Sequence, residues 1–193
     1  MPQVGVKETA YILFPQGDIL KKREIDAMLG RMAQGDNGAF ERLYVETKRG
    51  VYAFLYSYFN DRNDCEDAMQ TVYLKIKTNI SQYRVGTNGL AWILQIAKNT
   101  ALNDIRTNAN YRRLKSGETR AAVEPSDDVF LKDSLMSVMK RVLDEDEQRI
   151  IVLHVVWSYK HKEIAEMLGR PIGTVTSKYK RAVDKLKAAL KEE

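Results

Sequence analysis

The 193-residue sequence has a single cysteine, Cys65, and no long hydrophobic run. One cysteine cannot form an internal disulfide, which is typical of proteins in reducing compartments. The apolar stretch at residues 10–14 is short and is followed by Pro15. It therefore resembles neither a signal peptide nor the roughly 18 apolar residues needed to cross a bilayer. We expect a cytoplasmic protein without membrane insertion.

Proline, glycine and strand-like alternation are also scarce. Four prolines and eleven glycines punctuate the chain, and apolar residues recur at steps of three and four nearly throughout. We expect an all-α protein with two helical domains joined by a flexible linker, the C-terminal one a helix-turn-helix. The expected divisions are a poorly ordered N-terminal extension (1–21), a first domain (22–112), the linker (113–128) and a second domain (129–193). The apolar period is lost from about residue 107 onward.

Recognisable groups for catalysis or metal binding are missing. The two histidines, His154 and His161, have no cysteine or carboxylate arrangement that would suggest a metal site. His154 lies in the apolar stretch "IIVLHVVW", which is typical of a packed histidine. Cys65 is interpreted as structural or inert, with a redox-sensing role as the less favoured alternative. We expect neither an enzyme nor a cofactor.

The C-terminal part of the sequence has the pattern of a basic helix-turn-helix. In "HKEIAEMLGRPIGTV" (161–175), Ala165 is small enough for close helix packing, and Gly169 suits the left-handed conformation at a helix end. Pro171 suits the first turn of a following helix, because its missing N–H is no loss there. This spacing predicts two helices joined by a short turn. Residues 158–191 carry a local net charge of +6, against +5 for the whole chain.

The expected last helix has one apolar and one polar face. At 100° per residue, its apolar residues fall within an arc of roughly 120°. Lys and Arg neutralise phosphates, and Arg, Ser and Thr contact base edges, so the polar face suits the major groove of DNA. A merely solvated, lysine-rich face is the alternative. The candidate DNA-binding residues, including one on the preceding helix, are Lys162, Thr174, Thr176, Ser177, Lys178, Lys180 and Arg181.

The first domain is expected to hold a series of amphipathic helices. Apolar residues at helical spacing begin at Phe40, and the acidic stretch "NDRNDCED" (60–67) suits a helix start, where free amide groups favour negative charge. A polar, glycine-containing loop at 81–89 precedes "LAWILQIAKNTALNDIR" (90–106), which returns to helical spacing. Trp92 is interpreted either as a core residue or as a surface on which a base stacks.

Three of these segments resemble, in the same order, the bacterial extracytoplasmic-function (ECF) sigma factors. "DCEDAMQTVYLKIK" (64–77) is similar to the polymerase-binding segment, region 2.2, and residues 90–106 are similar to the promoter-melting segment. "YKHKEIAEMLGRPIGTVTSKYKRAVDKLK" (159–187) is similar to the promoter-recognition segment, region 4. The resemblance covers about residues 36–190 apart from the linker. It departs from the family pattern at Lys178, where Arg is usual, and in the basic start "YKHKEIA".

The resemblance implies a sigma factor that binds the largest subunits of the RNA polymerase core and directs promoter-specific initiation of transcription. An anti-sigma factor is a further implied partner. The helix-turn-helix would bind the upstream promoter element. The implied polymerase-binding residues are Asp67, Gln70 and Thr71. The implied residues for binding and melting the downstream element are Trp92, Lys98, Asn99, Asn103 and Arg106, with loop 81–89 as part of a pocket for an unpaired base.

Two other functions stay open from the residues alone. A stand-alone helix-turn-helix regulator, binding an operator as a dimer, would need the same DNA-binding helix but would use the first domain for dimerisation or for an effector. A degenerate sigma-like protein would act only as an interaction module. Co-purification with core polymerase distinguishes the first expectation from both.

Overall fold

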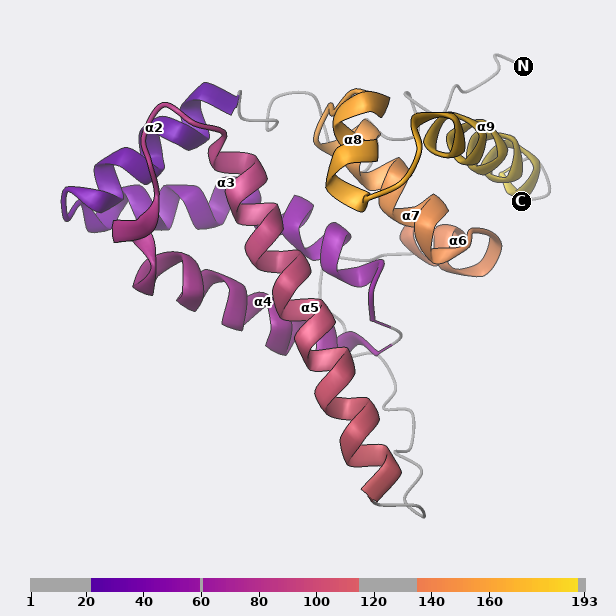
Figure 1. The fold of residues 1–193 in the computed structure, drawn as a ribbon, viewed down its shortest axis with the longest axis horizontal. Coiled ribbons are helices and arrows are strands. Elements are labelled where there is room, and N and C mark those ends of the chain that lie inside the picture. Colours follow the sequence, from indigo (N-terminus) through magenta and orange to yellow (C-terminus); the bar gives the residue numbers. More distant parts are fainter. Residues whose placement is uncertain (1–21, 60, 115–134, 191–193) are drawn as a thin grey trace.

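The computed structural model describes residues 22–59, 61–114 and 135–190, and every regular element within these ranges is helical (Figure 1). The expected all-α fold is therefore confirmed. The expected N-terminal extension and most of the expected linker lie outside the described residues.

Four helices form the first unit: α2 (Lys22–Ala33), α3 (Asn37–Tyr56), α4 (Arg62–Thr78) and α5 (Gly89–Leu114). A short 3-10 helix, η1 (Ile80–Gln82), follows α4 and leads into loop 83–88 before α5. Both α3 and α4 pack on α5, and α2 packs on α3 and α5. The loop therefore lies at the end of the bundle where α2 meets the start of α5.

Aspartate caps explain where α3 and α4 begin. The Asp36 side chain accepts a hydrogen bond from the Ala39 backbone N–H at 3.1 Å, and the Asp61 side chain accepts one from Asn63 at 2.8 Å. Each bond satisfies a backbone donor that has no partner within the first helical turn. Apolar residues at helical spacing then close the core, among them the fully buried Ile25, Leu29, Leu43, Val51, Leu55, Val72, Ile76 and Ile93.

The helix expected at 90–106 is longer than its apolar stripe indicated. α5 continues to Leu114, so it passes the end of the apolar period and extends two residues into the expected linker (113–128). Residues 107–114 contain no glycine or proline that would end the helix, and the next glycine is Gly117. Asn, Arg and Tyr have acceptable helix propensity, and a polar helix can continue past the point where it stops burying apolar surface.

The second unit consists of α6 (Leu135–Val142), α7 (Glu145–Ile151), α8 (His161–Leu168) and α9 (Ile172–Ala189). At the start of α7, Asp144 and Glu147 form a capping box, with bonds of 2.8 Å and 3.0 Å between each side chain and the other residue's backbone N–H. α7 then passes directly into a π-helical turn, η2 (Val152–Val156). The helical winding of the apolar stretch at 150–157 therefore widens after Ile151.

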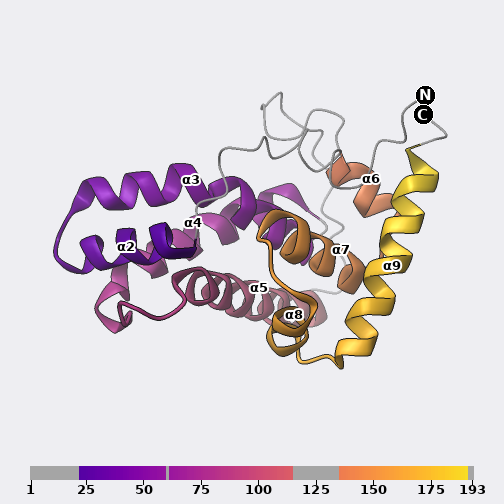
Figure 2. The ribbon, with the colours of Figure 1, turned by 90° about the horizontal axis from the view of Figure 1, so that it is seen from above.

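The expected helix-turn-helix is confirmed in α8 and α9. Gly169 ends α8 with a φ of +64°, the left-handed region that favours glycine, and Pro171 stands immediately before α9. On α9, Val175, Ala182 and Leu186 are fully buried. In Figure 2, α7 and α8 lie between the first unit and α9.

The two units pack against each other through an aromatic contact. Trp157 follows η2 and is 6% exposed; its ring lies on α3 at Gly50, where an added Cβ would come within 2.2 Å of Trp157 Cζ2. Only a glycine leaves room for the indole at this approach. Gly50 sits in the middle of α3, where glycine disfavours a helix by about 1 kcal/mol relative to alanine, so the close approach is the physical reason for it.

Polar contacts flank this aromatic contact. The Arg149 guanidinium lies 4.0 Å from the centre of the Tyr58 ring and donates a hydrogen bond to the Ser57 carbonyl at 3.4 Å. The Lys98 ammonium on α5 donates to the Met167 carbonyl near the end of α8 at 2.7 Å. Carbonyls at a helix C-terminus carry partial negative charge, which favours a cation there.

Candidate nucleic-acid interface

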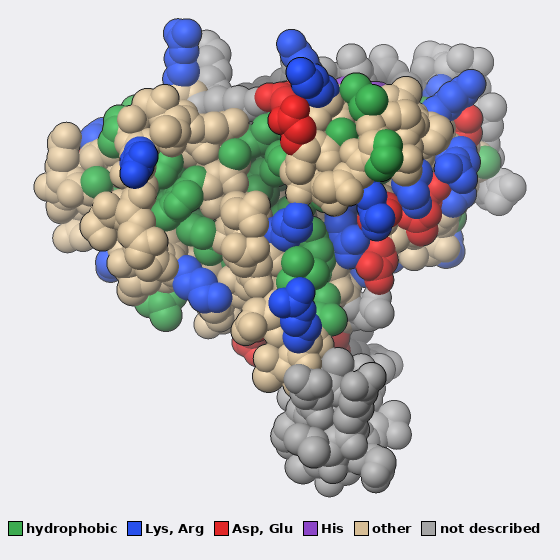
Figure 3. All heavy atoms as spheres, in the orientation of Figure 1, with side chains coloured by type: hydrophobic (Ala, Val, Ile, Leu, Met, Phe, Trp, Pro, Cys, Tyr) green, Lys and Arg blue, Asp and Glu red, His purple; other side chains and the backbone are tan. Residues whose placement is uncertain are grey.

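The polar face of α9 carries both hydroxyl and cationic side chains in the positions that its spacing indicated. Thr176, Ser177, Lys180 and Arg181 are exposed, and Lys162 is exposed on α8, whereas Thr174 is only partly so. Figure 3 shows that, on the face in view, Lys and Arg side chains gather at the end of the molecule that holds α7 to α9, with Asp and Glu between them. This arrangement offers donors to phosphates and to base edges.

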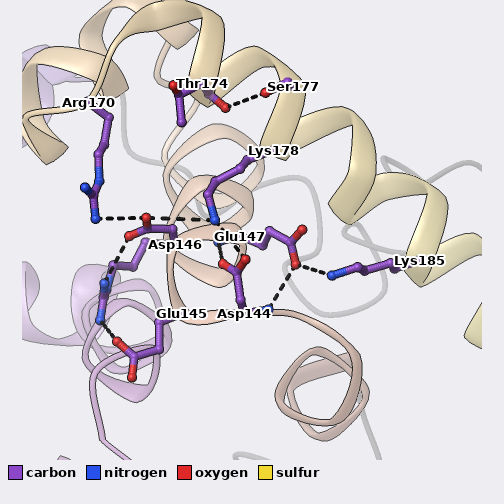
Figure 4. A network of polar contacts seen from close by, with 10 residues as sticks. Asp144, Glu145, Asp146, Glu147, Arg170, Thr174, Ser177, Lys178 and Lys185 are labelled. Carbon is purple, nitrogen blue, oxygen red and sulfur yellow. Dashed lines mark hydrogen bonds and ion pairs between the residues drawn. The ribbon is translucent and has the colours of Figure 1, made fainter.

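Lys178 differs from the other candidates, because its amine is bound to the start of α7. It lies 2.8 Å from Asp144 Oδ2 and 3.9 Å from Asp146 Oδ2, and its side chain is 21% exposed. Arg170 pairs with the same Asp146 carboxylate at 3.0 Å (Figure 4). Acids at the start of α7 thus neutralise part of the positive charge counted in this region. The same ion pairs link α9 and the turn before it to α7.

A second ion pair repeats this link further along α9. Lys185 lies 2.7 Å from Glu147 Oε2, and Glu147 is almost fully buried. A buried carboxylate is costly without a partner, and here the lysine and the capping-box N–H provide two. Partial burial works against the ionised form of Asp144, but hydrogen bonds from Lys178 and from the Glu147 N–H outweigh it and lower the pKa of the Asp144 carboxyl below 3.8.

Two histidines and a tyrosine, one each from η2, α8 and α9, pack with their rings tilted or edge-on to one another. His154, His161 and Tyr179 have ring centroids 4.6 to 4.9 Å apart. His154 Nδ1 lies 2.8 Å from the Tyr159 carbonyl oxygen, and His161 Nδ1 lies 3.2 Å from the Thr176 hydroxyl. Burial, with the neighbouring His154, lowers the pKa of His161. These rings pack α8 onto α9, in line with the expectation of a packed His154.

The candidate downstream-element residues on α5 differ in exposure and in their contacts. Asn99, Asn103 and Arg106 are exposed, and the Asn99 side-chain oxygen accepts a hydrogen bond from Gln95 at 2.8 Å. Trp92 is partly buried, and its ring lies 5.2 Å from the ring of Tyr83, which is only 6% exposed. The amine of Lys98 is bound to α8.

The candidate polymerase-binding residues lie along one side of α4. Asp67 and Gln70 are exposed and Thr71 is partly exposed. Leu74, one turn further on, is 62% exposed, which places an apolar side chain in the same strip. On the adjacent α5, burial raises the pKa of Asp104; Lys75 opposes this rise, and the carboxylates of Asp64 and Asp67 add to it. The α4–α5 surface is therefore acidic around Asp67.

The described ranges contain no cluster of three or more His, Cys, Asp or Glu that could hold a metal ion. Cys65 is fully buried, and burial raises the pKa of its thiol to about 12. Among the residues that the structure describes, no helix is both long and apolar enough for a membrane span.

Sequence reasoning did not single out several residues that shape these surfaces. Arg170 and the acids of "LDEDEQR" (143–149) were not named as candidates, although the density of acids there was a signal for cationic partners elsewhere in the chain. Asp26 on α2 accepts hydrogen bonds from loop 83–88, and no local pattern marks it, because its partners lie far away in the chain.

Comparison with known protein families finds two matching regions. The family model of sigma-70 region 2 matches residues 43–111, and the family model of sigma-70 region 4 matches residues 137–186. The ECF RNA polymerase sigma-E factor of Haemophilus influenzae is 30% identical over 172 residues, covering 81% of this chain and 89% of its own. The ECF sigma factor SigK of Mycobacterium tuberculosis is 26% identical over 177 residues, covering 86% and 94%.

Solved structures have the same fold. CnrH, in complex with the cytosolic domain of CnrY, is 18% identical with a TM-score of 0.58, over 88% of this chain and 99% of its own. The sigma factor RpoE of Bartonella quintana, in complex with the anti-sigma factor NepR, is 22% identical with a TM-score of 0.63, over 79% and 96%. Two sigma-70 regions on two helical units define a sigma factor. This chain belongs to the ECF RNA polymerase sigma factors.

Proposed function

We propose that this chain binds the RNA polymerase core and directs it to promoters with two elements, one contacted by α9 and one opened by α5 and loop 83–88. The observation that carries the proposal is the exposed hydroxyl and cationic face of α9 on a helix-turn-helix, in a chain that also has the sigma region 2.

The upstream element would be bound by α9 inserted in the major groove. Thr176, Ser177, Lys180 and Arg181 would make the direct contacts, with Thr174 at the edge of the face and Lys162 on a phosphate. Lys178 would act mainly by holding α9 to the start of α7, since its amine already has two carboxylate neighbours. The ion pairs beneath α9 favour a rigid presentation of this face.

The downstream element would be bound by the exposed Asn99, Asn103 and Arg106 and by the partly exposed ring of Trp92. Unstacking a base costs a few kcal/mol, and stacking on an aromatic ring with phosphate contacts offsets that cost. Lys98 would contact the strand backbone only after it releases the Met167 carbonyl. Promoter opening is therefore expected to compete with the contact between α5 and α8.

The polymerase core would meet the strip of Asp67, Gln70 and Thr71 on α4. The acidic surface there suits a basic partner, and exposed Leu74 adds apolar area to bury. As a non-enzymatic initiation factor, the chain would act in the cytoplasm. An anti-sigma partner is part of the proposal, because CnrH and the Bartonella RpoE were each solved with a protein partner.

Reconstituted transcription tests this function. The purified chain is combined with core polymerase, and start sites are mapped on genomic DNA with and without it. We expect new start sites that share two spaced sequence elements, and no tight binding of duplex DNA by the chain alone. A chain that binds one operator tightly as a dimer, without core polymerase, would instead be a stand-alone regulator. A chain that binds core and changes no start site would be an interaction module.

A further inference from the structure

Loop 83–88 is fastened to α2 along its length. The Asp26 carboxylate accepts a hydrogen bond from the Gly86 backbone N–H, with distances of 3.0 and 3.1 Å to its two oxygens. It accepts another from the Tyr83 hydroxyl. Val85 packs on Gly30 of α2, where an added Cβ would lie 3.2 Å from Val85 Cγ2. α2 therefore holds the first residue of the loop and its middle.

The backbone of the loop is shaped for this contact. Gly86 has a φ of +87°, a conformation that glycine adopts without strain and other residues do not. The Thr87 backbone N–H and hydroxyl both donate to the Arg84 carbonyl, at 3.3 and 2.7 Å. The turn from Arg84 to Thr87 is thus closed by its own bonds and fixed in place by Asp26.

Polar groups stand on the outer rim of this fixed turn. Arg84, Thr87 and Asn88 are exposed, and α5 begins beside them with the partly exposed Trp92, whose ring is tilted against the buried ring of Tyr83. A guanidinium and a hydroxyl beside an aromatic surface are the groups that bind an unstacked base and its phosphate. The Asp26 oxygens, in contrast, are already bound by the loop.

We propose that Asp26 is a positioning residue for the capture of an unpaired base of the downstream element. The inference rests on the proposed function and adds α2 to the elements that open the promoter. Ordering a free loop at the moment a base leaves the stack costs conformational entropy. By holding the turn through Gly86 and Tyr83 beforehand, Asp26 removes that cost without contacting DNA itself.

The experiment measures sequence selectivity of holoenzyme for single-stranded DNA. The probe is the labelled oligonucleotide that wild-type holoenzyme enriches from a randomised single-stranded pool, and the reference is a scrambled oligonucleotide of equal composition. Removing a negative charge strengthens binding to any DNA, so the ratio of the two affinities is the informative quantity. Asp26→Leu should lower that ratio about tenfold, as expected for losing hydrogen bonds to a charged acceptor.

Three further variants make the result specific. Asp26→Asn keeps the oxygen that accepts from both Tyr83 and Gly86 and should stay within about threefold of wild type. Gly86→Ala adds a Cβ that would have no atom within 4 Å, so it causes no clash, but alanine disfavours the positive φ of this position. It should therefore lower the affinity ratio as Asp26→Leu does, without any change to α2. Glu41→Leu removes an exposed acid from α3 and should leave the ratio unchanged.

Each outcome has one meaning. Wild-type holoenzyme that enriches no sequence overturns the proposed function itself. Wild-type enrichment with unchanged ratios for both Asp26→Leu and Gly86→Ala overturns the role of Asp26 alone. Asp26→Asn losing as much as Asp26→Leu also overturns it, because the oxygen acceptor would then not matter. If Asp26→Leu fails to bind core polymerase, the Gly86→Ala ratio decides.

Discussion

Trp157 lies on the backbone of α3 at Gly50, so closely that a single added methyl group would come within 2.2 Å of the indole. The contact joins the unit that carries region 2 to the unit that carries region 4. The Arg149–Tyr58 and Lys98–Met167 contacts also join the two units. The close packing of Trp157 on α3 therefore requires a glycine at position 50.

Gly50→Ala should push Trp157 off α3. Overpacking costs about 1–3 kcal/mol, whereas alanine in a helix interior contributes about 1 kcal/mol of stability relative to glycine. We expect the free energy of unfolding to fall, and Trp157 fluorescence, recorded in a Trp92→Phe background, to shift to longer wavelength. Gly38→Ala, in the same helix, is the control; its Cβ would meet only Asp36 Oδ1, at 3.3 Å. Higher stability with unchanged emission in Gly50→Ala would contradict the close contact.

The Cys65 thiol should be unreactive in the folded protein. It is fully buried, and its pKa is raised from 9.0 to about 12, so at pH 8 its thiolate fraction is about a thousandfold below that of an ordinary thiol. A thiol-specific reagent should therefore label the chain only after denaturation, as followed by mass spectrometry. Rapid stoichiometric labelling of the native chain would reopen the redox alternative.

Local patterns predicted the helical faces well, and tertiary contacts account for the misses. The apolar stripe of α9 and the turn at Gly169 depend on spacing and on backbone preference, which the sequence shows directly. The pairing of Lys178 with Asp144, the approach of Trp157 to Gly50 and the anchoring of Gly86 by Asp26 each join residues distant in the chain. No periodicity encodes such pairs, so the exposure of Lys178 and Lys98 was overestimated.

Arg181 and Lys178 should have separable roles. Arg181→Ala removes an exposed cation from the DNA-binding face and should weaken promoter binding by holoenzyme about ten- to a hundredfold, the range for a good base contact. Binding to core polymerase should not change. Filter binding with duplex promoter and a core-binding titration measure the two quantities. Loss of core affinity in Arg181→Ala would refute this division.

Lys178→Met should instead lower stability in a pH-dependent way. Its ion pairs are partly exposed, so the loss should be under about 1 kcal/mol. The folded-state pKa of Asp144 is lowered below 3.8, so the pair stabilises the fold above that pH, and the stabilisation is lost as the pH falls through the folded pKa. In urea titrations the difference from wild type should be full at neutral pH and should shrink as the pH falls from 3.8 through the lower folded-state pKa of Asp144. A difference independent of pH would contradict the ion-pair explanation.

Lys98→Ala tests whether α5 contacts the DNA backbone. In holoenzyme bound to the single-stranded downstream element, loss of one phosphate contact should reduce the slope of log K against log salt by about 0.7. Lys187→Ala, which removes an exposed cation near the end of α9, should leave the slope unchanged. An unchanged slope in Lys98→Ala would mean that Lys98 does not contact DNA and that its role is the hydrogen bond to the Met167 carbonyl.

Asp67→Arg should weaken binding to core polymerase. Asp67 is exposed on α4, beside exposed Leu74 and near the carboxyl of Asp104, whose pKa is raised mainly by burial and further by Asp64 and Asp67. Reversing its charge opposite a basic partner replaces an attraction by a repulsion, which should raise the dissociation constant by at least about tenfold. The effect should shrink with added salt, because exposed charges are screened.

Fluorescence titration of core polymerase with labelled chain measures this dissociation constant. The control is Glu41→Arg, which makes the same charge reversal on α3. Equal weakening by both variants would show general repulsion by added positive charge, and equal affinity to wild type would place the polymerase contact away from α4.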